Sequence, residues 1–516
     1  MYKETITADF TVRASNGRGV AETEDQTLRN CLRGTRKEYS GSPPAPKWFT
    51  ARGHFQVPPS ESGWFSREEA KERRRCSRID FSRRNQQYIV DLCQAARGGL
   101  WKCQVDETAK FMVGCRNYIV QLVFEDGVRW LLKTSQPNLK WSKYSDSPGI
   151  LNLEIATTLW LRHNTSLPVP RVRLWDVRTN QQNKFGKPWY VMEAVPGKTV
   201  DDQVKAATVR DKNFNWEKEQ SKRYRHLAKF ELESLRYPAP CRGRLILNAK
   251  ASYFHAGRQK LPLDQIEISE KDDGCGLANS MIQKLDLNSN VLKAKVDELE
   301  FEKQEIDAHV ALSDHLKEVL PKIIDKRFEK TYCLVHGDIT DANILCDSKF
   351  YTTAIIDWEL AKIVPLQLAV AKPGIDFNDL VRQVGDIFQK ATVRGKVDYA
   401  KVSKLWSEHD KTVRHQRNKF IEEVSKLDDS VMGDGKTPWT AGYKYVTGLY
   451  RLSHAIQTIW QFLSGYEDFL ELETEPSMFI LGEIRRLAEG ATKMVSEGIL
   501  SRENEDGLLD ELRYQV

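Results

Sequence analysis

The sequence is poor in long apolar runs and in paired cysteines. In 516 residues, no uninterrupted apolar stretch approaches the ~20 residues that a membrane-spanning helix requires. The first ten residues contain no apolar signal core, and Glu4, Asp9 and Glu22 argue against a transit peptide, which is poor in acidic residues. The nine cysteines form no Cys-x-x-Cys pair, which disfavours a zinc site or a disulfide framework. We therefore expect a cytoplasmic protein with no membrane partner.

Excess positive charge is absent from the body of the chain. The net charge is +6, and residues 1–85, with 17 Lys and Arg against 11 Asp and Glu, contain all of it. The remainder is neutral, so we expect no nucleic acid among its partners. Residues 1–85 are predicted to be a disordered basic arm in which residues 68–84 fit a solvated helix. Its cluster at residues 73–75 leaves nuclear import open, but a solvated basic face without a partner is the preferred interpretation.

One stretch, residues 332–359, contains polar residues suited to phosphoryl transfer. Two apolar β-type runs, 333–335 and 354–356, are each followed by acidic residues, and residues 344–348 between them fit a short hairpin. The polar residues that follow the runs are His336, Asp338, Asn343 and Asp357. Transfer from ATP needs a carboxylate that accepts or orients the proton of the attacking hydroxyl. It also needs a carboxylate and an amide oxygen to hold Mg²⁺. The alternative is a hairpin whose Asp and Asn residues only form turns.

The spacing of this motif is similar to that of known kinases. Protein kinases use His-Arg-Asp followed by Asn five positions after the Asp, whereas Gly337 stands here in place of the Arg and Ile-Asp-Trp in place of Asp-Phe-Gly. The pattern resembles the aminoglycoside phosphotransferase and choline kinase family of small-molecule kinases, and residues 112–118 resemble the loop of its fungal members. The resemblance implies that Asp338 is the catalytic base. It implies that Asn343 and Asp357 are the Mg²⁺ ligands.

The same resemblance implies an α+β, protein-kinase-like two-lobe fold, with a small antiparallel β lobe, a larger mainly helical lobe and ATP between them. Residues 118–124 and 129–133 are rich in β-forming side chains and flank a turn at 125–127, which predicts a hairpin in the small lobe. The predicted divisions are a disordered arm at 1–85, a small nucleotide-binding lobe at 86–195, a large catalytic and substrate lobe at 196–495 and an acidic tail at 496–516.

Five residues are expected at the nucleotide by this resemblance. Lys133 ends the second predicted strand, and in kinase-like folds a Lys there reaches the phosphates and pairs with a Glu of the next helix. Glu154, in the helical segment 149–162, is the expected partner. The strand that ends near residue 195 is the expected hinge. Met192 would line the adenine pocket, and backbone groups near Glu193 and Ala194 would pair with the adenine edge.

The function expected from these residues is an ATP- and Mg²⁺-dependent phosphotransferase that acts on a hydroxyl of a small molecule. Antibiotic, choline-like, sugar and homoserine-like acceptors all fit this chemistry. The sequence lacks a Gly-x-Gly-x-x-Gly loop: Gly114 stands alone, and Arg116 is available to supply charge. Because this loop has few glycines, the alternative function is a non-catalytic pseudokinase scaffold. A protein kinase is disfavoured because Gly337 replaces the Arg and no Ala-Pro-Glu segment follows the motif.

Overall fold

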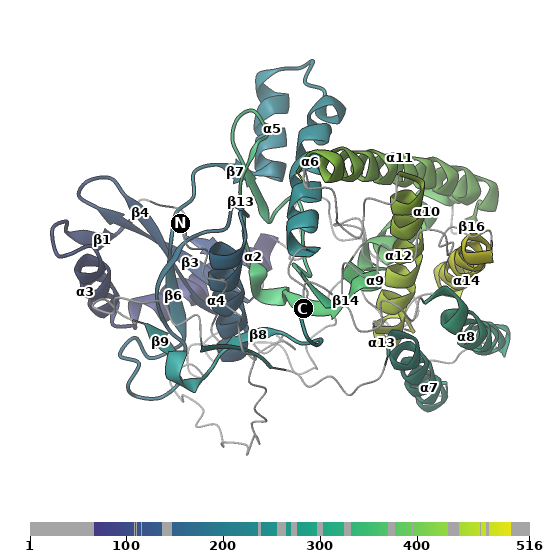
Figure 1. Cartoon of the computed structure of the whole chain (residues 1–516), viewed down its shortest axis with the longest axis horizontal. Coiled ribbons are helices and arrows are strands. Elements are labelled where there is room, and N and C mark those ends of the chain that lie inside the picture. Colours follow the sequence, from purple (N-terminus) through teal and green to yellow (C-terminus); the bar gives the residue numbers. More distant parts are fainter. Residues whose placement is uncertain are drawn as a thin grey trace.

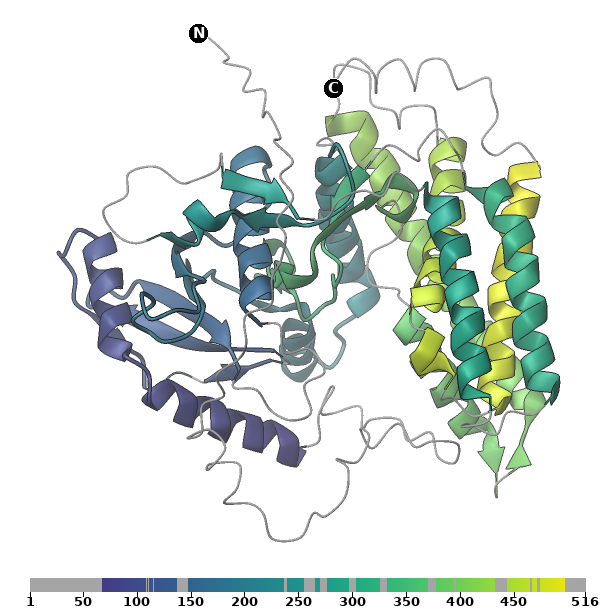
Figure 2. The ribbon, with the colours of Figure 1, turned by 90° about the horizontal axis from the view of Figure 1, so that it is seen from below.

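The chain folds into a sheet-rich lobe and a helical lobe that lie side by side (Figures 1 and 2). The computed structural model describes residues 67–107, 109, 111–114, 116–136, 147–235, 239–254, 265–269, 276–296, 303–324, 332–369, 377–393, 396–431, 443–464, 466–470 and 474–496. Within these residues, no helix is both long enough and apolar enough to cross a lipid bilayer.

A seven-stranded antiparallel sheet forms the small lobe, in the order β1-β3-β4-β6-β5-β9 with β2 paired to β3. The strands are β1 (Cys103–Val105), β2 (Met112–Val113), β3 (Asn117–Phe124), β4 (Arg129–Ser135), β5 (Val172–Asp176), β6 (Trp189–Glu193) and β9 (Tyr253–Phe254). The predicted hairpin of β3 and β4 is confirmed, and Gly127 with φ of 83° makes its turn, a backbone conformation that glycine adopts at little cost. The sheet takes its last strand, β9, from beyond residue 195.

Two N-terminal helices, α2 (Arg67–Ser82) and α3 (Gln86–Ala96), pack against this sheet at β2 and β1. Asp80 of α2 is 2% exposed and its carboxylate lies 2.6 Å from the Lys187 ammonium, while Phe81 belongs to the apolar core of the lobe. Residues 67–82 therefore form the predicted helix, but the prediction of a solvated helix is wrong because its last turn is buried. Residues 1–66 of the predicted disordered arm lie outside the described residues.

Helix α4 (Ser147–Asn164) packs on β4, β5 and β6 and also touches the 3-10 helix η4 (Trp358–Leu360). Leu151, Ile155 and Leu159 are buried, at the helical spacing that the sequence indicated. Helix α4 therefore connects the small-lobe sheet to the end of the motif.

Two small antiparallel units carry the motif itself. Strand β12 (Ile344–Cys346) pairs with β13 (Thr352–Ile355), as predicted for the hairpin, and also with β7 (Lys198–Thr199). Strand β11 (Tyr332–Val335) pairs with β14 (Lys362–Pro365) rather than with β13. The two halves of the motif thus enter the site from separate strand pairs.

Helices make up most of the second lobe, where α8 packs on α14, α6 on α11 and α12 on α14. They are α5 (Val200–Arg210), α6 (Trp216–Leu235), α7 (Leu277–Lys295), α8 (Lys303–Ile323), α9 (Leu366–Ala369), α10 (Phe377–Ala391), α11 (Tyr399–Val431), α12 (Tyr443–Ser464), α13 (Tyr466–Phe469) and α14 (Thr474–Ser496). The remaining short elements are β8 (Leu245–Leu247), β10 (Ile266–Ile268), β15 (Thr392–Val393), β16 (Lys396–Val397) and η1 (Ala249–Ala251). The α+β class and the division into an antiparallel lobe and a mainly helical lobe are confirmed. Residues 497–516 of the predicted acidic tail lie outside the described residues.

Candidate active site

Lys133 lies at the centre of the candidate site, where three carboxylates from two segments surround its ammonium. The Nζ atom lies 2.8 Å from Glu154 Oε2 and 2.6 Å from Asp357 Oδ1, and 3.7 Å from Glu359 Oε2. Lys133 is 4% exposed, so these contacts form away from bulk water. The ion pair of Lys133 with Glu154, predicted from residues 21 positions apart, is present, and the structure adds Asp357 and Glu359 to it.

The charges of this cluster do not balance. One ammonium faces three carboxylates, and burial raises the pKa of Glu154 to about 7 against the attraction of Lys133. Burial also opposes ionisation of Asp357, but Lys133 holds the pKa of that carboxyl below its ordinary value. Carboxyl oxygens of Glu154, Asp357 and Glu359 lie within 4.8 Å of one another. A set of oxygen donors with surplus negative charge fits a hard cation such as Mg²⁺.

Glu359 was not among the predicted site residues, although it stands only two positions after Asp357. Its Oε2 accepts a hydrogen bond from Asn117 Nδ2 at 2.5 Å, and its Oε1 lies 3.5 Å from the guanidinium of Arg116. Arg116 was expected to bring positive charge to the phosphate-covering loop, and in the structure that charge lies against Glu359. Arg116 and Asn117, at the start of β3, thus connect the small lobe to the end of the motif.

The turn before β3 is itself held by a side chain from the end of β4. The Gln136 amide donates to the carbonyl oxygens of Gly114 and Asn117, and its backbone N–H donates to the Arg116 carbonyl at 2.7 Å. Arg73 of α2 donates to the Gln136 side chain at 3.4 Å. Helix α2 therefore contacts the residue that fixes the position expected for the phosphate-covering loop.

Gly337 cannot carry a side chain in this fold. Its φ of 82° is one that L-residues adopt at a cost, and a Cβ atom there would collide with the backbone carbonyl of Leu360. The replacement of the protein-kinase Arg by Gly therefore has a steric cause in this chain. Asp357 also has a positive φ, 69°, which a residue with a short polar side chain tolerates better than most.

His336 joins the two halves of the motif. Its Nε2 lies 2.9 Å from the Ile356 carbonyl oxygen, and its Nδ1 accepts from the Asp338 backbone N–H at 3.3 Å. Nε2 must therefore carry the proton, because a carbonyl oxygen only accepts. Burial lowers the pKa of His336 to about 4, so the ring is neutral at physiological pH. A neutral ring fixes the backbone beside Asp338 and the backbone beside Asp357 at the same time.

Asn343 is oriented by Asp338. Its Nδ2 donates to the Asp338 carbonyl at 2.8 Å and to the Asp338 carboxylate at 3.1 Å. Because the amide nitrogen is used in this way, the amide oxygen of Asn343 points away from Asp338. The predicted catalytic base and one predicted metal ligand are thus in direct contact.

The hinge differs in detail from the prediction. Met192 is buried at the end of β6, as expected. The N–H groups of Glu193 and Ala194, however, donate to carbonyl groups of neighbouring strands and loops at 2.9 and 3.1 Å. Among the described hydrogen bonds, none uses the N–H of Val195. The hinge donor for a nucleotide base is therefore better sought at Val195 than at Glu193 or Ala194.

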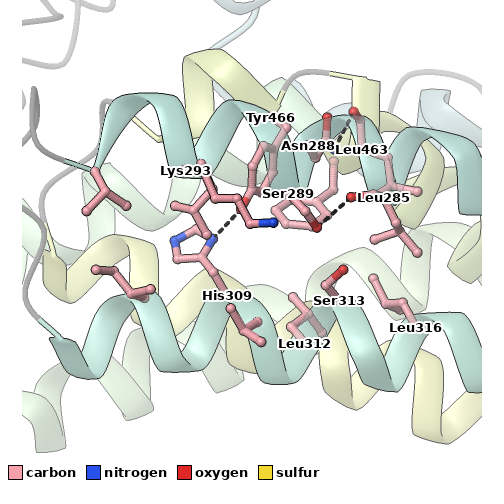
Figure 3. Close-up of a pocket in the computed structure, with 15 residues that line it drawn as sticks. Leu285, Asn288, Ser289, Lys293, His309, Leu312, Ser313, Leu316, Leu463 and Tyr466 are labelled. Atoms are coloured by element: carbon pink, nitrogen blue, oxygen red, sulfur yellow. Dashed lines mark hydrogen bonds between the residues drawn. The ribbon is translucent and has the colours of Figure 1, made fainter.

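A separate cavity of about 190 Å³ lies in the helical lobe, between α7 and α8 (Figure 3). His309 Nδ1 lies 2.8 Å from the Tyr466 hydroxyl at its wall, and burial lowers the pKa of His309 to about 4. The residues that line this cavity include no carboxylate and none of the predicted site residues. It lacks the groups that phosphoryl transfer requires, so we assign the candidate site to the cluster around Lys133.

The chain is similar to a number of solved structures, among them the following three. The GDP complex of a mutant aminoglycoside 2'-phosphotransferase-IIIa has 14% identity and a TM-score of 0.37, covering 79% of this chain and 100% of that chain. Choline kinase from Cryptosporidium parvum Iowa II has 12% identity and a TM-score of 0.35, covering 81% and 98%. Macrolide 2'-phosphotransferase from Brachybacterium faecium has 14% identity and a TM-score of 0.34, covering 79% and 97%. No curated protein sequence matches the chain.

A family model described as the phosphotransferase enzyme family matches residues 113–368. The matched segment begins at β2, passes through Lys133 and the hinge, and ends after the motif at α9. The fold is protein-kinase-like, and through residues 113–368 the chain belongs to the phosphotransferase enzyme family.

Proposed function

We propose that this protein transfers a phosphoryl group from ATP to a hydroxyl group of a small molecule. The observation that carries the proposal is the bridge made by His336, which holds Asp338 and Asp357 in a fixed relation beside the buried pair of Lys133 and Glu154. Positioning and charge stabilisation supply most of the catalysis in phosphoryl transfer, because the protein has little covalent chemistry to perform. A rigid set of charges is therefore what this reaction demands.

Asp338 is the proposed proton acceptor for the attacking hydroxyl. The contact from Asn343 Nδ2 to its Oδ2 limits rotation of the carboxylate and so helps to orient it toward a substrate hydroxyl. A positioned general base contributes typically 10²–10⁴ in rate. The acceptor class is the open part of this proposal: aminoglycoside-like, choline-like and sugar alcohols all present a hydroxyl that this carboxylate can deprotonate.

Asp357 and the Asn343 amide oxygen are the proposed ligands of Mg²⁺, and Glu359 adds a third oxygen donor close to Asp357. The fit rests on the surplus of negative charge around Lys133, which a divalent cation would neutralise. When bound, Mg²⁺ neutralises charge on the phosphates of ATP. Lys133 supplies a buried ammonium for the same phosphates, and the Val195 N–H is the proposed donor to the adenine edge. Because ATP is the proposed donor, a cytoplasmic location belongs to the same proposal.

The test is ADP release by the purified chain across a panel of hydroxyl compounds that includes aminoglycosides, choline and simple sugars. We expect at least one acceptor to raise ADP release above the solvent rate, and Asp338→Asn to lower that turnover by ~10²–10⁴ while ATP still binds. Asp201→Asn, at an exposed position of α5, is the matched control and should behave as wild type. Unchanged turnover in Asp338→Asn would remove this residue from the mechanism. ATP binding without turnover on any acceptor would favour the non-catalytic scaffold.

A further inference from the structure

Helix α3 and strand β1 bring two cysteines of the small lobe together. After α3 the chain reverses through Gly98 and Gly99, whose φ angles of 75° and 73° suit glycine and strain other residues. The reversal lays β1 beside α3, and β1 then pairs with β3 so that Cys103 stands opposite Phe124. Cys93 and Cys103, ten positions apart in sequence, thereby enter the same buried apolar cluster, where their thiols interact.

The two thiols have different surroundings. Cys93 is fully buried in the apolar cluster of the lobe, and burial raises the pKa of its thiol well above the ordinary value. Cys103 is 7% exposed at the sheet edge. Arg97 lies nearby, held by a bidentate ion pair with Asp126 at 2.8 and 2.7 Å. The hydrogen bond from Cys93, aided by the charge of Arg97, lowers the pKa of Cys103.

We propose that Cys93 and Cys103 form an oxidation-sensitive dithiol, which hydrogen peroxide converts into a disulfide. The thiolate of Cys103 attacks one peroxide oxygen, the O–O bond breaks, and the departing hydroxide takes up a proton to become water. The sulfenic acid left on Cys103 is then attacked by the Cys93 sulfur. The thiol proton and the sulfenic hydroxyl leave together as a second water. Two electrons pass from the two sulfurs to one peroxide molecule, and α3 becomes covalently joined to β1.

Two other described cysteines make a useful contrast. Cys333 and Cys346 are each 1% exposed on strands β11 and β12, and burial raises their pKa values to about 12 and about 11. Buried thiols with raised pKa values react slowly with peroxide, since the thiolate is the reactive form. The two thiols of the motif are therefore internal controls for the pair in the small lobe.

Trypsin separates the relevant cysteines, which makes peptide mapping decisive. Cleavage after Arg84, Arg97, Lys102 and Lys110 places Cys93 in peptide 85–97 and Cys103 in peptide 103–110. The full chain is treated with hydrogen peroxide, blocked with iodoacetamide and digested without reductant. We expect a linked pair of these two peptides, lighter than their sum by two hydrogens and released by dithiothreitol. The peroxide dose should leave peptide 331–349, which carries Cys333 and Cys346, unmodified.

Variants assign the order of events. In Cys93→Ser the linked pair should vanish and Cys103 should proceed to the sulfinic acid, whereas Cys76→Ser on α2 should form the link as wild type does. The peptide map is made on the wild-type protein, so the test still holds if a variant fails to fold. The proposal is overturned if peptides 85–97 and 103–110 are recovered separately with both cysteines alkylated. A link from peptide 103–110 to peptide 111–116, which carries Cys115, would overturn it equally.

Discussion

Replacing Asp80 with alanine tests whether α2 is an integral part of the nucleotide lobe. Asp80 Oδ2 accepts from the Lys187 ammonium at 2.6 Å and from the Tyr118 hydroxyl at 3.0 Å, while Oδ1 accepts from Arg84 at 2.6 Å. Lys187 is 9% exposed and Tyr118 is fully buried, so neither group regains water when the carboxylate is removed. The substitution therefore leaves the Lys187 ammonium with the Ser135 carbonyl oxygen but without its carboxylate, and it takes the Asp80 acceptor from the buried Tyr118 hydroxyl.

The size of the effect follows from these burials. Breaking a buried ion pair by removing one partner costs about 3–5 kcal/mol, because the remaining charge is uncompensated. Burial already lowers the pKa of Lys187 to about 8, against the attraction of Asp80, so this lysine can lose its proton near neutral pH. The free energy of unfolding should therefore fall by about 3–5 kcal/mol at pH 7 and by less at pH 9, where a neutral lysine no longer needs the carboxylate.

Urea-induced unfolding followed by tryptophan fluorescence measures this difference. Asp91→Ala, on the exposed face of α3, is the matched control and should change stability by no more than about 0.5 kcal/mol. Removing residues 1–66 should leave the unfolding midpoint unchanged, whereas removing residues 1–85 should lower it, because only the second truncation takes away Asp80. An Asp80→Ala protein within about 1 kcal/mol of wild type at pH 7 would refute the reasoning and return α2 to the status of an accessory arm.

Three further predictions concern the motif. Asp357→Ala should weaken Mg-ATP binding in calorimetry more than Asn343→Ala, because a carboxylate gives Mg²⁺ a charge and an amide only a dipole; equal losses would contradict this ranking. Lys133→Met should lower ADP release strongly while the protein stays folded by circular dichroism, and full activity would remove Lys133 from the phosphate site. His336 has a pKa of about 4 in the folded chain, against 6.5 when exposed. Between these pH values the unfolded chain binds more protons than the folded chain, so the free energy of unfolding falls as pH drops from about 6.5 to about 4. His336→Asn should lessen that fall in urea midpoints at pH 7 and pH 5, and an identical fall would show that another group titrates there.

The motif and its nearest partners could be predicted from the sequence because they depend on local order. Gly337, Asp338 and Asn343 lie within one loop, and the strand with Lys133 and the helix with Glu154 follow each other directly in the chain. Apolar spacing predicted the strands and the helix, and the resemblance to the kinase family supplied the pairing of Lys133 with Glu154. The same local reasoning found the β3–β4 and β12–β13 hairpins, whose turns carry their own residue signals.

What the sequence could not supply depends on contacts between distant segments. The carboxylate of Glu359 contacts Asn117, 242 positions earlier, and Lys133, and neither contact can be read from the local sequence. Helix α2 is charge-dense enough to suggest a solvated surface. The buried position of Asp80 follows from its contacts with Lys187, which lies just before β6, and with Tyr118 of β3. The proposed hinge donor is Val195 for a similar reason, since strand pairing rather than composition decides that the N–H groups of Glu193 and Ala194 are already used.

The shared ammonium at Lys133 has a thermodynamic consequence for the proposed ligands. A nucleotide whose phosphates attract Lys133 reduces the neutralisation of Glu154 and Asp357 by that ammonium. A cation that binds these carboxylates weakens their ion pairs with Lys133. Binding of either ligand should therefore increase the affinity of the site for the other. Binding free energies coupled in this way are reciprocal: ATP should tighten Mg²⁺ binding by the same factor by which Mg²⁺ tightens ATP binding. Because Lys133 is shared in this way, the pocket should respond to Mg-ATP as a unit and weakly to either component alone.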